Sequence, residues 1–209
     1  MPARLRPTAP TAADAVLVGD PGRALLLAQV LLAEPKMSNH ARGLWGYSGR
    51  TPEGRELTIQ STGMGGPSAA VVLADLAKLG VRRAVRVGTC VALDPAPAPG
   101  ELLVVDEAVG SGGVVLPDPE LTAKLKGELG DVGTARVASL DDPHADPPAG
   151  VIAADMQTAT VLARGRSLEM AAAAVLIVER TASGERVADE VLEDAAKRAG
   201  EAAREVLST

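Results

Sequence analysis

Residues 56–68, ELTIQSTGMGGPS, pass from a strand pattern through a glycine-rich turn into the start of a helix. Three glycines fall within four positions after the strand, and Pro67 fits the first turn of the helix that follows. A second apolar strand, over residues 83–87, leads into Gly88 in the same manner. This alternation predicts an α/β protein, and we expect a three-layer αβα sandwich around a mixed central sheet.

The rest of the chain continues the alternation without internal repeats. We expect residues 14–209 to form a single domain, because no linker divides them, and residues 1–13 to form a flexible lead. Further strands are expected at 15–18, 43–49, 102–109, 132–138 and 172–178. Further helices are expected at 22–33, 119–129, 155–164 and 187–207, with a loop over 141–150.

Composition argues against several classes of protein. The net charge of −6 disfavours a general nucleic-acid binder, which needs a basic face. Cys90 is the only cysteine, and neither His40 nor His144 has further ligands at metal-binding spacing, so we predict no disulfide and no metal site. Without a signal-peptide pattern or an apolar run of roughly 20 residues, we expect a cytoplasmic protein with no membrane partner.

Arg86 is the strongest candidate for binding an anion. It ends a buried apolar strand, and a buried guanidinium is costly unless it is paired or holds an anion. Thr89, three residues later, can add a hydroxyl beside the charge, an arrangement suited to inorganic phosphate or another small oxyanion. Asp94 and Glu101 are alternative, purely structural partners for Arg86.

Three further segments place glycine or charged residues where α/β sheets usually build their sites. In residues 19–23, GDPGR, a backbone N–H and Arg23 could face an anion at a helix start, although a plain capped turn fits as well. The glycines of residues 63–66 could admit a ligand close to the backbone or only make a tight turn. Asp155, in residues 155–157, could be no more than a helix cap.

Taken together, the order and spacing of these segments resemble the nucleoside phosphorylase family, which includes uridine phosphorylase and the hexameric bacterial purine nucleoside phosphorylase. The resemblance is close over residues 15–110 and looser over 150–207. Residues 18–23 are similar to the family's GDPxR loop, residues 61–68 to STGxGGPS, and residues 86–89 to the RxGT/S strand end. It implies a phosphorylase/hydrolase-like fold and phosphate held by Gly19, Arg23, Arg42, Arg86 and Thr89.

The carboxyl-terminal half extends the resemblance to the nucleoside. Residues 155–160, DMQTAT, are similar to the family's ribose-gripping EMExAT, and residues 177–181, IVERT, resemble the IVNRT of the uridine enzyme. The resemblance implies Arg86 and Arg180 as catalytic residues. It implies ribose and base contacts from Met64, Cys90, Val91, Asp155, Met156 and Gln157. Arg42 would be lent across a subunit interface, which implies a homodimer or a hexamer.

Three departures from the family pattern keep more than one function open. Val91 stands where the family has glycine, Gln157 where it has glutamate, and the loop over 140–152 is shorter. We expect phosphorolysis of a purine or pyrimidine nucleoside, with the uridine type slightly favoured, phosphate as co-substrate and no cofactor. A non-catalytic relative that binds phosphate or nucleoside is the alternative, and a hydrolytic nucleosidase is a weaker one. The sequence decides neither the base nor the sugar.

Overall fold

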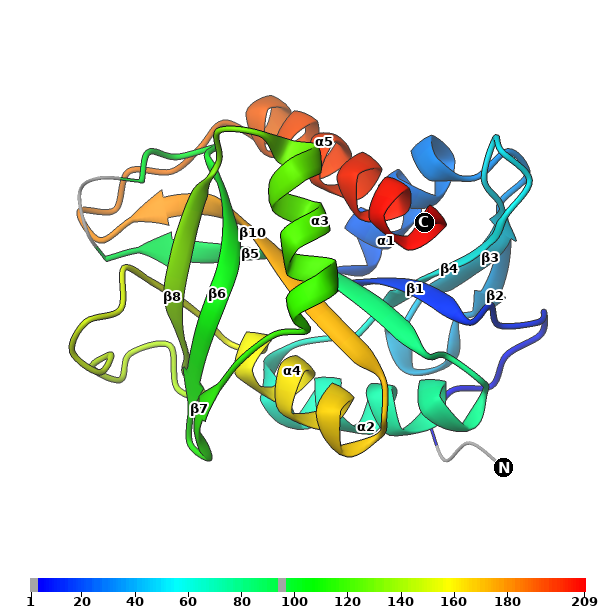
Figure 1. Ribbon diagram of the computed structural model, residues 1–209, viewed down its shortest axis with the longest axis horizontal. Helices are drawn as coiled ribbons and strands as arrows, with labels where there is room; N and C mark the ends of the chain where they lie inside the picture. The colour runs from blue at the N-terminus through cyan, green and yellow to red at the C-terminus, as the bar shows by residue number, and fades with distance from the viewer. Residues whose placement is uncertain (1–3, 94–96) are drawn as a thin grey trace.

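The computed structural model describes residues 4–93 and 97–209 and consists of one mixed sheet between two layers of helices (Figure 1). The strands are β1 (Asp14–Val18), β2 (Lys36–Asn39), β3 (Gly46–Arg50), β4 (Glu56–Ser61), β5 (Arg83–Ala92), β6 (Leu102–Gly110), β7 (Gly113–Val115), β8 (Gly133–Ser139), β9 (Ala153–Asp155) and β10 (Ala171–Thr181). The helices are α1 (Pro21–Leu31), α2 (Gly65–Lys78), α3 (Pro119–Leu129), α4 (Thr158–Ser167) and α5 (Asp189–Ser208), with a 3₁₀ turn at Ala41–Gly43.

The parallel part of the sheet brings the segments of interest to one edge. β1 runs parallel to β4 and β5, and β5 runs parallel to β10. Antiparallel pairs add β3 and β2 on one side, while β5, β9, β8, β6 and β10 pair in a closed circle on the other. The carboxyl ends of β1, β4, β5 and β10 therefore lie close together, where ligands bind in α/β folds.

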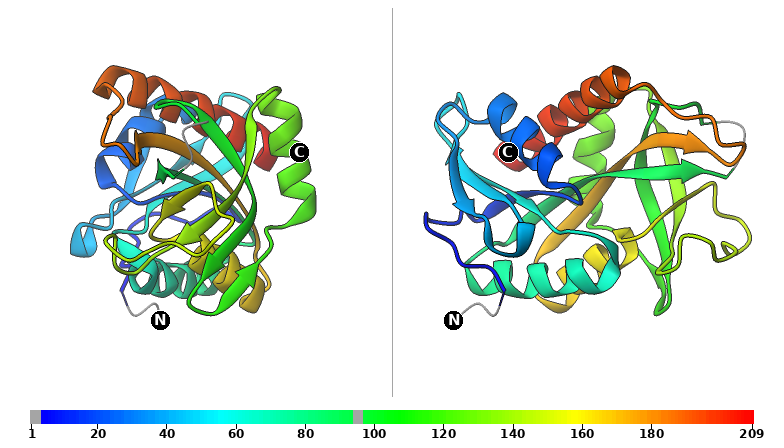
Figure 2. Two further views of the ribbon diagram at one scale, coloured as in Figure 1. Left: turned by 90° about the vertical axis from the view of Figure 1, so that its left-hand side faces the viewer. Right: turned by 180° about the vertical axis from the view of Figure 1, so that it is seen from behind.

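Two aliphatic cores hold the helices to the sheet. One core joins α1, α3 and α5 to one face of the sheet, and the other joins α2 and α4 to the opposite face. Figure 1 shows α1 and α5 above the sheet and α2 and α4 below it, and Figure 2 shows the same layers from behind. These layers confirm the expected αβα sandwich with a mixed sheet.

Elements with strong local signals fall where the sequence predicts them. β4 and α3 have the expected bounds, and α3 begins at Pro119 after Asp118, whose carboxylate accepts the N–H of Leu121 at 2.9 Å. The expected strand over 43–49 begins only at Gly46, because the 3₁₀ turn takes up the residues before it. The helix expected from residue 155 begins at Thr158, because Asp155 ends β9.

β5 does not end where the sequence predicts. It continues through Gly88 to Ala92, paired with β10, so Arg86 lies inside the strand and not at its end. The sequence favours a turn at Gly88, but this residue keeps an ordinary strand conformation. The sequence pattern does not predict the short strands β2, β7 and β9, since they are too short to stand out.

The segment before β1 contacts the body of the protein. The backbone N–H of Leu5 donates to the Asp75 carboxylate at 3.0 Å, and that of Ala12 donates to the Thr58 hydroxyl at 2.9 Å. The side chain of Leu5 is buried in the core beside α2. No helix in the described ranges has the length and apolar character needed to cross a bilayer.

Candidate active site

A cavity of about 680 Å³ opens at the carboxyl ends of the parallel strands. Its walls are the turn after β1, the loop after β4, the end of β5, the β9–α4 junction and the end of β10. It gathers every residue predicted for the site except Arg42: Gly19, Arg23, Met64, Arg86, Thr89, Cys90, Val91, Asp155, Met156, Gln157 and Arg180. Residues from distant sequence segments therefore share one cavity.

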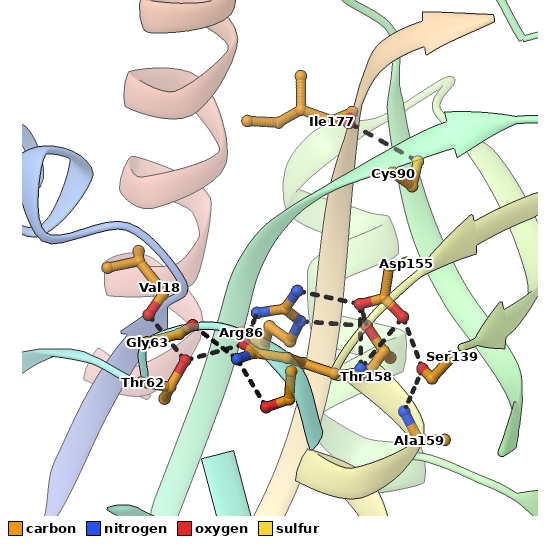
Figure 3. A network of polar contacts seen from close by, with 12 residues as sticks. Val18, Thr62, Gly63, Arg86, Cys90, Ser139, Asp155, Thr158, Ala159 and Ile177 are labelled. Atoms are coloured by element: carbon orange, nitrogen blue, oxygen red, sulfur yellow. Dashed lines mark hydrogen bonds and ion pairs between the residues drawn. The ribbon is translucent and has the colours of Figure 1, made fainter. Parts of the chain in front are cut away.

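The side chain of Arg86 is buried and held on three sides. Its Nη2 pairs with Oδ2 of Asp155 at 3.0 Å, its Nη1 donates to Oε1 of Gln157 at 3.0 Å, and its Nε donates to the Thr158 hydroxyl at 3.1 Å (Figure 3). Three of the five N–H groups of the guanidinium are used in these bonds. The orientation of Arg86 is therefore fixed before any anion arrives.

The structure identifies a partner for Arg86 that the sequence did not suggest. Glu101 is not bonded to it, since its carboxylate accepts the N–H of Ala98, and Asp94 lies outside the described residues. The side chain of Asp155 is 1% exposed and also accepts bonds from Ser139 and Thr158. Ser139 and Thr158 therefore belong to the network, and only the Asp-x-x-Thr spacing hints at the second of them.

Gly88 makes room for this arrangement. A Cβ atom built on Gly88 would lie 2.5 Å from Nη2 and 2.6 Å from Cζ of Arg86. The guanidinium therefore lies against the bare backbone of β5, and any larger residue at Gly88 would displace it. This contact explains the Arg-x-Gly spacing better than the turn that the sequence suggested.

Arg23 contrasts with Arg86, although both line the same cavity. The carboxylate of Asp20 caps the backbone N–H of Arg23 at the start of α1. The guanidinium of Arg23, however, makes no hydrogen bond or ion pair within residues 4–93 and 97–209. Burial lowers the pKa of Arg23, the charge of Asp20 opposes this, and the charge of Arg86 adds to it. Two guanidinium groups that repel each other across a cavity favour an anion between them.

Cys90 lies beside these charges but stays neutral. It is 4% exposed, and burial raises the pKa of its thiol to about 12. Its Sγ lies 3.6 Å from the carbonyl oxygen of Ile177 (Figure 3). A thiol of this kind is a small apolar wall of the cavity and not a nucleophile.

We expect the native protein to resist alkylation at Cys90. Because the thiol pKa is raised, the thiolate forms only as the pH approaches 12, and reagents such as iodoacetamide attack the thiolate. Mass spectrometry after treatment at about pH 8 should find Cys90 unmodified in the folded protein and modified in urea. Labelling of the folded protein at the rate of a small free thiol would contradict this description.

The cavity is also lined by Arg180 and by Glu179, a residue of the 177–181 segment that the sequence did not assign to the site. The charge of Glu179, like that of Asp20, opposes the lowering of the Arg23 pKa by burial. Oε1 of Glu179 accepts a bond from Nη2 of Arg186 at 2.8 Å, and the Arg180 side chain is exposed at the rim. The Arg180 backbone pairs with Val91, whose side chain also lines the cavity. The apolar part of the cavity lining includes Val91, Leu140, Pro143, Met156 and Leu192.

Arg42 is the one predicted residue that the structure does not bring to the cavity. It lies in the 3₁₀ turn with an exposed side chain and a left-handed backbone, φ 61° and ψ 21°. That conformation is uncommon for residues other than glycine. A role for Arg42 in a neighbouring subunit stays a prediction.

No group of three or more His, Cys, Asp or Glu side chains suited to a metal ion occurs within the described ranges. The buried carboxylate of Asp155 is already saturated by Arg86, Ser139 and Thr158. The guanidinium, hydroxyl and backbone N–H groups of the cavity favour an oxyanion, while Asp20 and Glu179 add negative charge to the same lining.

Comparison with known proteins gives a family and several relatives. The family model described as the Phosphorylase superfamily matches residues 14–209. The chain is 43% identical over 83 residues to the purine nucleoside phosphorylase DeoD-type of Oceanobacillus iheyensis, which covers 39% of the chain and 35% of that protein. It is 34% identical over 108 residues to the protein of the same name from Streptococcus pyogenes, or 51% of the chain and 45% of that protein.

The chain spans about a third to just under half of the length of these curated relatives. Both relatives carry a purine name, so the slight preference for a uridine-type substrate finds no support among them.

Proposed function

The chain belongs to the phosphorylase superfamily, and on that basis we propose that it is a nucleoside phosphorylase acting on purine nucleosides. It would use inorganic phosphate as co-substrate and release the free base and a pentose 1-phosphate. One observation carries the proposal: Arg23 and Arg86 line the same cavity, and the guanidinium of Arg23 makes no bond within the described ranges. A hydrolase, which uses water, has no need of two converging cations.

The proposed reaction divides the cavity into two halves. Phosphate binds between Arg23 and Arg86, with further bonds from the Gly19 N–H and the Thr89 hydroxyl, and attacks C1′ of the sugar as the base leaves. Holding the anion next to the sugar supplies effective molarity, and its negative charge stabilises the positive charge that develops on the ribose. The protein itself supplies position and charge, and no cofactor takes part.

The purine preference rests on the relatives and on the apolar part of the cavity lining. Val91, Leu140 and Met156 offer an apolar surface for a flat base. Glu179 and Arg180 line the same cavity and supply polar groups for the edge of such a base. A donor there stabilises the anion of the leaving base, and Arg180 is the residue we propose for this role.

Assembly is part of the proposal, because Arg42 lies outside the cavity of its own chain. In a two-fold symmetric dimer, the exposed turn that carries Arg42 in each copy would contact the other copy. The resemblance to the family implies that such dimers could assemble further into a hexamer. Light scattering that finds a monomer at assay concentration would remove Arg42 from the site.

A panel of nucleosides assayed with and without phosphate tests the proposal. We expect base release from inosine, adenosine or guanosine only when phosphate is present, with little release from uridine. Release of base in phosphate-free buffer would instead identify a hydrolytic nucleosidase. Phosphate binding without release from any nucleoside would identify a binding protein, the alternative that Val91 and Gln157 keep open.

A further inference from the structure

The side chain of Gln157, in the cavity wall, has all its polar atoms hydrogen-bonded to other parts of the protein. It is 2% exposed, and its Nε2 donates to the carbonyl oxygens of Gly63 at 2.7 Å and Gly65 at 3.1 Å. Its Oε1 accepts Nη1 of Arg86 at 3.0 Å and lies 2.9 Å from the Thr62 hydroxyl. Both N–H groups and the oxygen are thus committed to other parts of the protein.

The neighbours of Gln157 require an amide at this position. Two carbonyl oxygens on one side need two donors, and the guanidinium on the other needs an acceptor. A carboxylate would meet the Arg86 requirement, but it would place negative oxygens against the carbonyls of Gly63 and Gly65, with the buried charge of Asp155 on the other side of Arg86. Glutamine can therefore bond the loop carbonyls and the Arg86 guanidinium together, whereas glutamate can bond only the guanidinium.

The loop that Gln157 holds is itself a wall of the cavity. Gly63 and Gly65 both have positive φ, 73° and 78°, so their backbone shape is unusual and needs support. A Cβ atom on Gly19 would lie 3.5 Å from the Gly63 carbonyl oxygen and 3.7 Å from Oε1 of Gln157. The side-chain amide of Gln157 thus lies where three segments come together: the turn after β1, the loop after β4, and Arg86 on β5.

We propose that Gln157 is a positioning residue that ties the loop of residues 63–65 to the guanidinium of Arg86 and so sets the shape of the anion site. Its side chain acts on a bound anion through Arg86 and the loop, and not by gripping a sugar. The effect on phosphate rests on the function proposed above, whereas the tie itself does not.

Two variants and one control separate this role from simple stability. Gln157→Met keeps the length of the side chain and removes all four contacts, and Gln157→Glu keeps the acceptor but loses both donors. The control is Gln60→Glu, because Gln60 is also 2% exposed and its Nε2 donates to the carbonyls of Leu44 at 3.0 Å and Ser61 at 2.8 Å. Gln60 does not line the cavity. Gln60→Glu therefore makes the same chemical change as Gln157→Glu at a buried site outside the cavity.

The first measurement is amide hydrogen exchange without any ligand, read at Thr62, whose N–H donates to the carbonyl oxygen of Val18 at 2.7 Å where the loop begins. We expect exchange to rise about tenfold or more in both Gln157 variants and to change little in Gln60→Glu, since only the former release the loop. Equal protection of the loop in wild type and Gln157→Met would overturn the tie, and so would equal loss of protection in the control. This measurement does not depend on nucleoside cleavage. Absence of cleavage would contradict the proposed function without affecting the link between Gln157 and the loop.

The second measurement is the affinity for sulfate, whose charge is constant between about pH 5.5 and pH 8. At about pH 8 we expect both Gln157 variants to bind sulfate about tenfold more weakly than wild type, because Arg86 and the loop lose their common support. Gln60→Glu should bind sulfate with wild-type affinity, because Gln60 does not line the cavity. Wild-type affinity in both Gln157 variants would overturn the proposal.

Discussion

Replacing Arg86 by alanine is expected to abolish phosphate-dependent cleavage and to destabilise the fold. The change removes one of the two guanidinium groups of the anion site, which should lower kcat/KM by at least about 100-fold. It also leaves the Asp155 carboxylate, 1% exposed, without its cation, and breaking a buried pair on one side costs about 3–5 kcal/mol. Urea unfolding and kinetics on the same preparation measure both effects.

Arg83→Ala is the matched control for that experiment. Arg83 lies on the same strand, and its guanidinium pairs with Asp14 at 2.8 Å, but it does not line the cavity. This variant should lose stability while keeping kcat/KM near the wild-type value. If folded Arg86→Ala retained wild-type activity, or if Arg83→Ala lost activity to the same degree, the assignment of Arg86 would be wrong.

Replacing Arg23 by alanine is expected to weaken phosphate binding without destabilising the protein. Its guanidinium makes no bond within the described ranges, and burial lowers its pKa, which means that the folded protein disfavours its charged form. Removing it should therefore leave the free energy of unfolding unchanged or slightly raised. Loss of charge-assisted bonds to the anion should raise the KM for phosphate about 10–100-fold.

Arg23→Lys provides the comparison for this second variant. It restores the charge but not the planar fork, so phosphate binding should recover only in part. A loss of stability in Arg23→Ala as large as that of Arg86→Ala would show that Arg23 is a structural cation. An unchanged KM for phosphate in a stable Arg23→Ala would remove it from the anion site. We therefore expect the Arg23 variant to affect phosphate binding alone and the Arg86 variant to affect both phosphate binding and stability.

Local signals predicted much of the fold. The bounds of β4 and α3 follow from an apolar pattern and from the pair Asp118-Pro119 at a helix start. The cavity residues Gly19 and Arg23 could be found from the sequence because glycine and charge after parallel strands collect at one edge of a sheet.

Contacts between distant segments could not be predicted in the same way. The partner of Arg86 is Asp155, 69 residues further along the chain, and the role of Gln157 depends on a loop more than 90 residues before it. Ser139 has no local pattern that marks it, and β9, with 3 residues, is too short to show periodicity. Glu179 lies in the segment 177–181, but that motif points to Arg180 and not to its neighbour. The turn predicted at Gly88 is wrong because glycine in a strand can serve a close approach as well as a turn.

The central claim, that this cavity uses phosphate to cleave a nucleoside, is tested most directly by the products of one reaction. A purine nucleoside that is cleaved by the protein is incubated with inorganic phosphate, and free base, pentose 1-phosphate and free pentose are measured together. We predict one pentose 1-phosphate for each base released and no release when phosphate is omitted. Base released with free pentose in its place, at a rate independent of phosphate, would contradict the account.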